Sequence, residues 1–302
     1  MKESIAPSRV EVEDFLSELN LVVEKQIIEG HLSLPIYRCV DLSGQGFVIK
    51  IGSSESGKKE VEDNLYGYKK MQEMSIDDLI PQPISEILTP WGPAILMSDL
   101  GKSFAKTSTT AESTRVSFVT FGECLVKITK NALRDKETQG LEEVTSQIKK
   151  WIYKLKDADL VGNQIVAKLE EINLKQISGK KSSWMLLDFT PDNVFVNNNT
   201  TKFIDPWRQT TYFGTPIPSI AQFITLSEDI YHLSGFNNEN LNYTNLISNL
   251  GQIMNLSDYQ LHSQIALGKA LQYSLSSFVR IESKPDMAEV YANKCNNIIK
   301  SL

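Results

Sequence analysis

The chain has 302 residues, of which 41% are hydrophobic and 23% charged, and this composition is typical of a globular protein. Its formal net charge of −6 argues against a nucleic-acid partner, which would require a basic face. The cysteines, Cys39, Cys124 and Cys295, lie far apart, so we expect buried reduced thiols and no zinc or disulfide framework. No apolar run approaches the roughly 18 residues of a membrane helix, and no signal peptide is visible at the N-terminus. We therefore expect a cytoplasmic protein without a membrane partner.

The first hundred residues alternate between helices and short strands. Residues 9–20 have the apolar spacing of an amphipathic helix, with Val10, Phe15, Leu16 and Leu19 as its expected buried stripe. Segments rich in Val, Ile and Tyr, separated by Gly, Ser or Pro, predict strands. These strands lie at 21–30, 34–42, 46–52, 83–89 and 92–101, with a predicted helix at 57–74.

The remainder of the chain has mainly the apolar spacing of helices. Spaced apolar positions predict helices over 111–180 and again over 216–302, with one short strand pair between them. This order predicts an α+β fold. Residues 1–100 would form a five-stranded antiparallel sheet with a helix, and residues 101–302 a larger, mainly helical part.

The strand pair lies in residues 184–209, WMLLDFTPDNVFVNNNTTKFIDPWRQ. The apolar runs VFV and KFI flank an Asn- and Thr-rich stretch at 197–201, which predicts a hairpin turn. A five-residue turn would pair Val194 with Ile204. Opposed residues of an antiparallel pair lie about 4.5–5.5 Å apart and share a face.

This register has a chemical consequence. It places Asn193 opposite Asp205, so that an amide oxygen and a carboxylate converge. Such oxygens suit Mg²⁺, which takes one or two protein carboxylates together with phosphate and water. Asp188 lies in the loop that leads into the same end of the hairpin, where a second carboxylate could accept a proton from a hydroxyl.

The string LLDFTPDNVFV, followed by FIDPW, resembles the catalytic loop and metal-binding segment of the kinase-like superfamily. It is most similar to the branch that contains aminoglycoside phosphotransferases and choline kinases. Upstream, GFVIKI carries Lys50 where the family keeps its phosphate-binding lysine, and ILMSDLG is similar to the strand and hinge that hold adenine. The resemblance covers about residues 21–210. It implies a two-lobed protein-kinase-like fold, with nucleotide binding in residues 1–100 and the catalytic loop and acceptor site in residues 101–302.

The resemblance also implies the cofactors and the reaction. ATP and Mg²⁺ would be bound, and the γ-phosphoryl group would pass to a hydroxyl of a small molecule. Asp188 would be the catalytic carboxylate, Asn193 and Asp205 the metal ligands, and Lys50 the group that neutralises phosphate charge. The remaining implied nucleotide contacts are the Ser98 carbonyl, the Leu100 N–H, the Met97 side chain and Ser33.

In the family a glutamate on the helix after this strand pairs with the phosphate-binding lysine. Glu60 and Glu62 both qualify by position. They lie about 200° apart around a helix of about 100° per residue, so only one can face inward. Glu60 is preferred, because Gly67 and Met71 share its side of the helix.

Two departures leave a second hypothesis open. Leu186 stands where the family keeps a histidine, and Thr190 stands where it keeps a basic residue near the transferred phosphate. A catalytically weak, pseudokinase-like ATP-binding regulator is therefore the alternative to an enzyme. Aminoglycoside-, choline-, sugar- and nucleoside-like acceptors all stay open, as do a monomer and a homodimer. The candidate acceptor-site residues are Trp207, Tyr212, Phe213, Glu228, Asp229 and Tyr231.

Overall fold

The computed structural model describes most of the chain. The described residues are 7–27, 34–73, 75–108, 110–132, 141–171, 183–186, 190–197, 200–206, 211–214, 217–229, 232–233 and 243–302. Contacts divide the chain into two compact units, which are described separately below. The sheet unit comprises residues 1–101 and 202–208, and the helical unit comprises residues 102–201 and 209–302.

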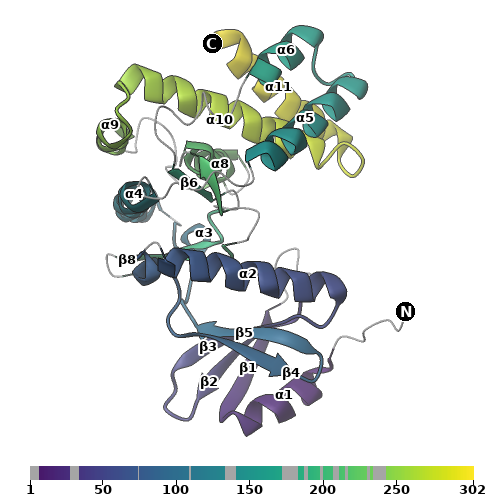
Figure 1. The fold of residues 1–302 in the computed structure, drawn as a ribbon, viewed down its shortest axis with the longest axis vertical. Coiled ribbons are helices and arrows are strands. Elements are labelled where there is room, and N and C mark those ends of the chain that lie inside the picture. The colour runs from purple at the N-terminus through teal and green to yellow at the C-terminus, as the bar shows by residue number, and fades with distance from the viewer. Residues whose placement is uncertain are drawn as a thin grey trace. The chain divides into compact units, whose positions relative to one another are not determined.

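A five-stranded antiparallel sheet in the order β1-β2-β3-β5-β4 forms the centre of the sheet unit (Figure 1). All five strands predicted from the sequence are confirmed. The helix predicted at 57–74 is also present, as α2, and a short 3-10 helix follows it at Asp77–Leu79. The bounds are β1 Leu21–Ile27, β2 Ile36–Asp41, β3 Gly46–Ile51, α2 Glu55–Glu73, β4 Ile84–Thr89 and β5 Gly92–Ser98.

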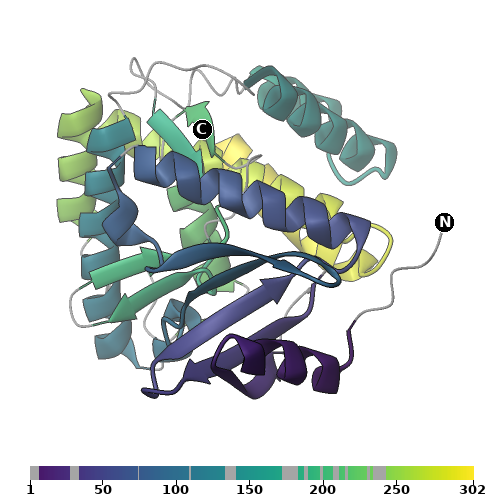
Figure 2. The same ribbon diagram turned by 60° about the horizontal axis from the view of Figure 1, so that its bottom comes forward.

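The sheet has two chemically different faces, covered by α1 (Arg9–Glu18) on one side and α2 on the other (Figures 1 and 2). The α1 face is an apolar cluster that draws on four strands. Because side chains alternate along a strand, the residues between these apolar positions point to the α2 face. The buried members of the cluster are Val12, Leu16, Leu21, Val23, Tyr37, Cys39, Phe47, Ile49, Ile51 and Ala94.

Helix α1 begins at a capping box, in which the Ser8 hydroxyl accepts from the Glu11 N–H and the Glu11 carboxylate accepts from the Ser8 N–H. Its buried stripe is Val12 and Leu16, one turn apart. The stripe expected from the sequence was wrong at two positions, since Val10 is 64% and Leu19 41% exposed. Val10 lies about 200° around the helix from Val12 and therefore faces away from the sheet.

The helical unit contains the two predicted helical regions, which are confirmed over the described residues. Its core includes an aromatic cluster in which the rings of Phe121 and Phe223 stack at 4.1 Å and Phe104 meets Phe223 edge-on at 5.0 Å. The bounds are α3 Phe104–Thr107, α4 Ala111–Ala132, α5 Leu141–Asp157, α6 Asn163–Glu171, α8 Ile217–Asp229, α9 Tyr243–Met254, α10 Asp258–Phe278 and α11 Pro285–Ser301.

The strands between the helical regions differ from the prediction in number and length. Two strand pairs are present rather than one, because β6 (Ser183–Leu186) pairs antiparallel with β9 (Thr211–Gly214). The predicted hairpin exists as β7 (Val194–Asn197) and β8 (Thr200–Phe203). Asn197, Thr200 and Thr201, which were expected in a five-residue turn, belong to the strands. Thr200 and Thr201 are β-branched, and such residues favour strands. β8 ends at Phe203, so Ile204, which was expected to pair with Val194, lies beyond the strand.

No helix in the described part of the chain is long and apolar enough to cross a membrane.

Candidate active site

An ion pair between Lys50 and Asp205 lies at the centre of the candidate site. Lys50 is on β3 directly opposite Ile95 of β5, and its side chain points to the α2 face of the sheet. The residue is only 4% exposed, and a charged group buried in this way needs an oppositely charged partner nearby. Asp205 is 155 positions away in the sequence, and the fold brings its Oδ1 to the Lys50 ammonium.

Asp205 is not held by a strand ladder, as the sequence argument supposed. It lies beyond the end of β8 and has a left-handed backbone conformation, with φ of 57°. Its N–H donates to the Tyr68 hydroxyl of α2 at 3.3 Å. Left-handed conformations of non-glycine residues are uncommon, and they concentrate at functional sites where surrounding contacts fix them.

Glycine at position 67 permits this placement. A Cβ on Gly67 would lie 1.6 Å from the carbonyl oxygen of Pro206, which no real structure tolerates. The backbone that carries Asp205 therefore lies directly against α2. Two adjacent residues of α2 thus fix the position of Asp205, Gly67 sterically and Tyr68 by a hydrogen bond.

Tyr68 connects this turn to the sheet. Its hydroxyl donates to Met97 Sδ on β5 at 3.6 Å while it accepts from the Asp205 N–H. Burial, and after it the Asp205 carboxylate, raise the pKa of Tyr68 well above its ordinary value. Tyr68 is therefore a neutral hydrogen-bonding link between α2, β5 and Asp205.

The predicted hinge segment after β5 is fixed by Asp99. Its N–H donates to the Gly46 carbonyl at 3.0 Å, and its carboxylate accepts from the Gly101 N–H at 2.9 Å and from Arg38. Asp99 raises the pKa of Arg38 through this hydrogen bond. Asp99, which lies between Ser98 and Leu100, is therefore held by both its backbone and its side chain, and this fixes the segment.

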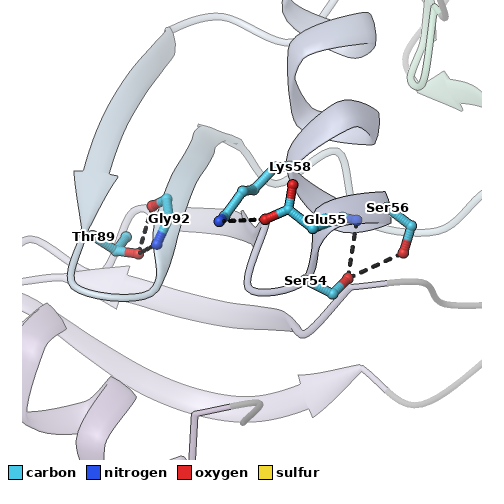
Figure 3. Close-up of polar contacts among 7 residues, drawn as sticks. Ser54, Glu55, Ser56, Lys58, Thr89 and Gly92 are labelled. Carbon is cyan, nitrogen blue, oxygen red and sulfur yellow. Dashed lines mark hydrogen bonds and ion pairs between the residues drawn. The ribbon is translucent and has the colours of Figure 1, made fainter. Parts of the chain in front are cut away.

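The first turn of α2 lies beside the turn between β4 and β5, with Lys58 next to Gly92 (Figure 3). The Ser54 hydroxyl caps the helix by accepting from the Gly57 N–H at 3.0 Å, and Lys58 pairs with Glu55 at 2.9 Å. A Cβ on Gly92 would lie 2.2 Å from the Gly52 carbonyl and 3.3 Å from Lys58 Cε. The beginning of α2 therefore lies beside the beginning of β5.

The same turn repeats the spacing of a phosphate-binding loop, because Gly52, Gly57 and Lys58 match G-x-x-x-x-G-K. Two features of the structure argue against that function. The Gly57 N–H is already bound by Ser54, and the Lys58 ammonium by Glu55. Lys59 also replaces the Ser or Thr that such loops use on Mg²⁺. We interpret this turn as a helix start rather than a nucleotide site.

The predicted catalytic loop belongs to the helical unit. Asp188 lies outside the described residues, and so does Ser33 of the first hairpin. The following turn is well defined, since the Asn193 N–H donates to the Thr190 carbonyl at 3.0 Å. It rests on α3, where the Ala105 N–H donates to the Pro191 carbonyl at 3.1 Å. The convergence of Asn193 on Asp205 stays a prediction.

On α2, the structure distinguishes the candidate partners of Lys50. Glu60 is half-buried and Glu62 is exposed. The Lys50–Glu60 pair stays a prediction, because the ion pair that the structure describes for Lys50 is with Asp205. The sequence argument missed Asp63 and Asn64, which are 5% and 1% exposed. The available signal was Asn64, a polar residue one turn before Tyr68 and therefore on the side of the helix that faces the sheet.

The candidate acceptor residues that the structure describes with side chains are Glu228 and Asp229, at the end of α8. Glu228 pairs with Lys269 of α10 at 2.8 Å. Asp229 accepts from the Tyr273 hydroxyl and from the Lys294 ammonium. These contacts tie α8 to α10 and α11. The backbones of Tyr212 and Phe213 lie on β9, and Trp207 and Tyr231 lie outside the described residues.

The fold matches that of solved small-molecule phosphotransferases and choline kinases, as the sequence predicted. The choline kinase LicA from Streptococcus pneumoniae superposes with a TM-score of 0.62 and 14% identity over 98% of this chain and 100% of that one.

Two other solved structures give similar values. A choline/ethanolamine kinase family protein from Mesorhizobium loti has a TM-score of 0.61 and 10% identity, over 91% of this chain and 88% of that one. An aminoglycoside 2'-phosphotransferase in complex with GDP has a TM-score of 0.61 and 10% identity, over 97% of each chain. No protein-family model matches the sequence, and no curated protein matches it. These likenesses define the fold.

Proposed function

We propose that the protein is an ATP-dependent phosphotransferase that moves the γ-phosphoryl group to a hydroxyl of a small molecule. One observation carries the proposal, which is the buried ion pair between Lys50 and Asp205 on the α2 face of the sheet. A lysine buried there stabilises the protein less than an apolar side chain of its size would. Its presence is explained by a function that needs a cation and a carboxylate at one point.

In this proposal the sheet unit binds the nucleotide. Lys50 neutralises the charge of the phosphates, which is the largest requirement of phosphoryl transfer. The Ser98 carbonyl and the Leu100 N–H contact adenine from the segment that Asp99 anchors. Met97, which is buried and hydrogen-bonded to Tyr68, closes the back of the pocket. Ser33 contacts a phosphate from the first hairpin.

The residues present fit Mg²⁺. Asp205 offers a carboxylate of which Lys50 binds Oδ1, and Asn193 offers an amide oxygen. Both are hard oxygen ligands, and Mg²⁺ needs only one or two protein ligands besides phosphate and water. When bound, the metal would neutralise phosphate charge and hold the phosphate oxygens. The phosphates of the nucleotide would compete with Asp205 for the Lys50 ammonium, so metal and nucleotide should bind together.

Asp188 is the proposed catalytic carboxylate. In this role it accepts a hydrogen bond from the acceptor hydroxyl and takes its proton as the phosphoryl group arrives. Most of the acceleration would come from alignment and from fixed charges, because phosphoryl transfer needs little covalent assistance. The acceptor binds in the helical unit. The small-molecule kinases of the same fold support this class of acceptor.

The experiment separates the two carboxylates. MgATP should raise the melting temperature of the wild-type protein, since a ligand that binds only the native state stabilises it by mass action. Asp205→Ala should abolish the Mg²⁺-dependent part of this shift. Asp188→Asn should retain the shift and lose turnover, measured with a panel of aminoglycoside, choline, sugar and nucleoside acceptors, because its role belongs to the transition state.

Each other outcome has a definite meaning. A wild-type protein with no thermal shift at millimolar ATP would contradict nucleotide binding altogether. Equal loss of the shift in both variants would show that Asp188 is a metal ligand or a structural residue. Binding of MgATP without turnover of any acceptor would favour the alternative regulator, for which Thr190 and Leu186 are the sequence argument.

A further inference from the structure

Asn64 of α2 is a buried amide without a partner. The residue is 1% exposed. Neither Oδ1 nor Nδ2 of its side chain forms a hydrogen bond within the part of the chain that the structure describes. Buried amides of folded proteins are nearly always hydrogen-bonded, because an unsatisfied one destabilises the native state. Such an amide is available for a hydrogen bond in a second state of the protein.

Two fixed points show where Asn64 lies along the sheet. Lys58 is beside Gly92 at the start of β5, and the Tyr68 hydroxyl contacts Met97 near its end. Ten helical residues rise about 15 Å and five strand residues about 17 Å, so α2 and β5 run in the same direction at matched lengths. Asn64, about 9 Å along this stretch of helix, therefore lies at the level of Ile95.

Ile95 is the residue of β5 directly opposite Lys50 on β3. Both side chains point to the α2 face, as do Met97 and its partner Val48. Asn64 and Lys50 are therefore at the same level of the same layer, between the sheet and the helix. The run of α2 along this face of the sheet can be followed in Figure 2.

The position of Asp205 agrees with this level. Its backbone is bound to Tyr68, which is one helical turn after Asn64, and its carboxylate reaches Lys50. Residues four apart on a helix are neighbours, with Cβ atoms about 5–6 Å apart. Asn64 thus lies on the same side of α2 as the contact that holds Asp205.

Lys50 has more donors than Asp205 can satisfy. An ammonium carries three N–H groups, and the Asp205 Oδ1 accepts one of them. If the phosphates of a nucleotide draw Lys50 away from Asp205, the buried ammonium needs an acceptor on its α2 side. The Asn64 amide oxygen is a neutral acceptor at that level, and it adds no negative charge that would compete with phosphate.

We propose, on the basis of the nucleotide-binding function above, that Asn64 is a positioning residue for Lys50. Its amide oxygen accepts a hydrogen bond from the Lys50 ammonium when that ammonium turns from Asp205 to the phosphates. Glu60, the glutamate expected in this role, lies one turn earlier on α2, nearer the start of β5. Asn64 acts through Lys50 and touches neither the reacting atoms nor the adenine.

The test is a double-mutant cycle read by binding, so the unknown acceptor is not needed. Calorimetry would measure the Kd of ATP with Mg²⁺ and of adenosine for wild type, Asn64→Leu, Lys50→Met and the double variant. Asn64→Leu should weaken ATP binding by about tenfold, the value of one hydrogen bond to a charged group, and leave adenosine unchanged. In the Lys50→Met background the same change should have no effect on ATP.

Two control variants distinguish loss of the Asn64 acceptor from a general effect on the fold. Asn64→Asp supplies an acceptor but adds a negative charge that competes with phosphate, so it should recover ATP binding only in part. Gln72→Leu removes an amide at an exposed position of α2 and should change nothing. If Asn64→Leu does not fold, Asn64→Ala enters the same cycle.

The outcomes that overturn the proposal are distinct from a failure of the proposed function. Equal losses for ATP and adenosine, a full effect without Lys50, or no effect at all would make Asn64 a structural residue or the partner of a buried water. If the effect of Glu60→Gln on the Kd of ATP depended on Lys50, and that of Asn64→Leu did not, the role would belong to Glu60. A wild-type protein that binds no ATP would instead contradict the function itself.

Discussion

The two faces of the five-stranded sheet are built from alternate residues of the same strands, and they have opposite chemistry. Ile49 and Ile51 of β3 point into the apolar cluster under α1, whereas Lys50 between them points toward α2. The α1 face contains no charged side chain among its buried members. The α2 face holds the buried polar residues Lys50 and Asn64. One strand thus supplies stability on one side and a charged site on the other.

The strongest test of this contrast uses two neighbouring residues. Ile49→Ala removes a fully buried side chain and should lower the free energy of unfolding by about 2–5 kcal/mol, with the nucleotide affinity of the folded fraction preserved. Lys50→Met should destabilise the protein less, because the Asp205 side chain that it leaves unpaired is partly exposed and can be hydrated. It should abolish the binding of phosphates. Urea unfolding and ATP titration would measure both.

Similar effects of Ile49→Ala and Lys50→Met on stability and ATP binding would contradict this division between the two faces. Loss of ATP binding in folded Ile49→Ala, or a large loss of stability with intact ATP binding in Lys50→Met, would show that the two faces do not divide stability and function.

A second prediction concerns the α2 face alone. Gly67→Ala would favour the helix intrinsically by about 1 kcal/mol. The new Cβ would meet the Pro206 carbonyl at 1.6 Å, so the segment that carries Asp205 must move. We expect a net loss of about 2–3 kcal/mol of stability, of the order that overpacking costs, together with weaker MgATP binding. Thermal unfolding with and without MgATP would measure it.

Lys69→Ala, at an exposed position of the same helix, is the matched control and should leave stability and binding nearly unchanged. An increase in the stability of Gly67→Ala would show that Pro206 does not lie against α2.

The smallest expected effect tests the apolar face. Burial raises the pKa of Cys39 to about 11, so its thiol is neutral at pH 7. The thiolate is the reactive form. Iodoacetamide should therefore label native Cys39 negligibly at neutral pH, because the thiol is protonated and its side chain is 0% exposed. Mass spectrometry of labelled peptides would resolve this site from the others.

Unfolding in guanidinium should make Cys39 reactive at its ordinary pKa. Rapid labelling of native Cys39 at pH 7 would mean that the α1 face is open to water.

The sequence predicted the sheet well because each strand carries its own signal. β1 to β5 are short, rich in β-branched residues and bounded by Gly, Pro or Ser, and all five were found. Helix α1 was placed correctly, but its stripe was wrong at Val10 and Leu19, because the face that a helix buries depends on its partner. The four-residue strands β6 and β9 were missed, since their pairing is set by a distant segment.

The candidate site was less accessible to sequence reasoning. Lys50 and Asp205 were both identified from motifs, but their ion pair was not, because it joins residues of distant segments. The strand pattern predicts Asp205 opposite Asn193 by register. The structure places it by a left-handed residue, a tyrosine hydroxyl and a glycine on α2. None of these three has a local sequence signature, and the unpartnered amide of Asn64 depends on the packing around it.

The inclusion of residues 202–208 in the sheet unit has a consequence for biosynthesis. Domains generally fold from the N-terminus as the chain leaves the ribosome. Here residues 1–101 emerge first, but they lack the carboxylate that compensates Lys50 and the backbone that covers Gly67. About two-thirds of the chain must be translated before that segment arrives. The nascent sheet can close its apolar face early, whereas its charged face must wait for Asp205, with the buried lysine uncompensated until then.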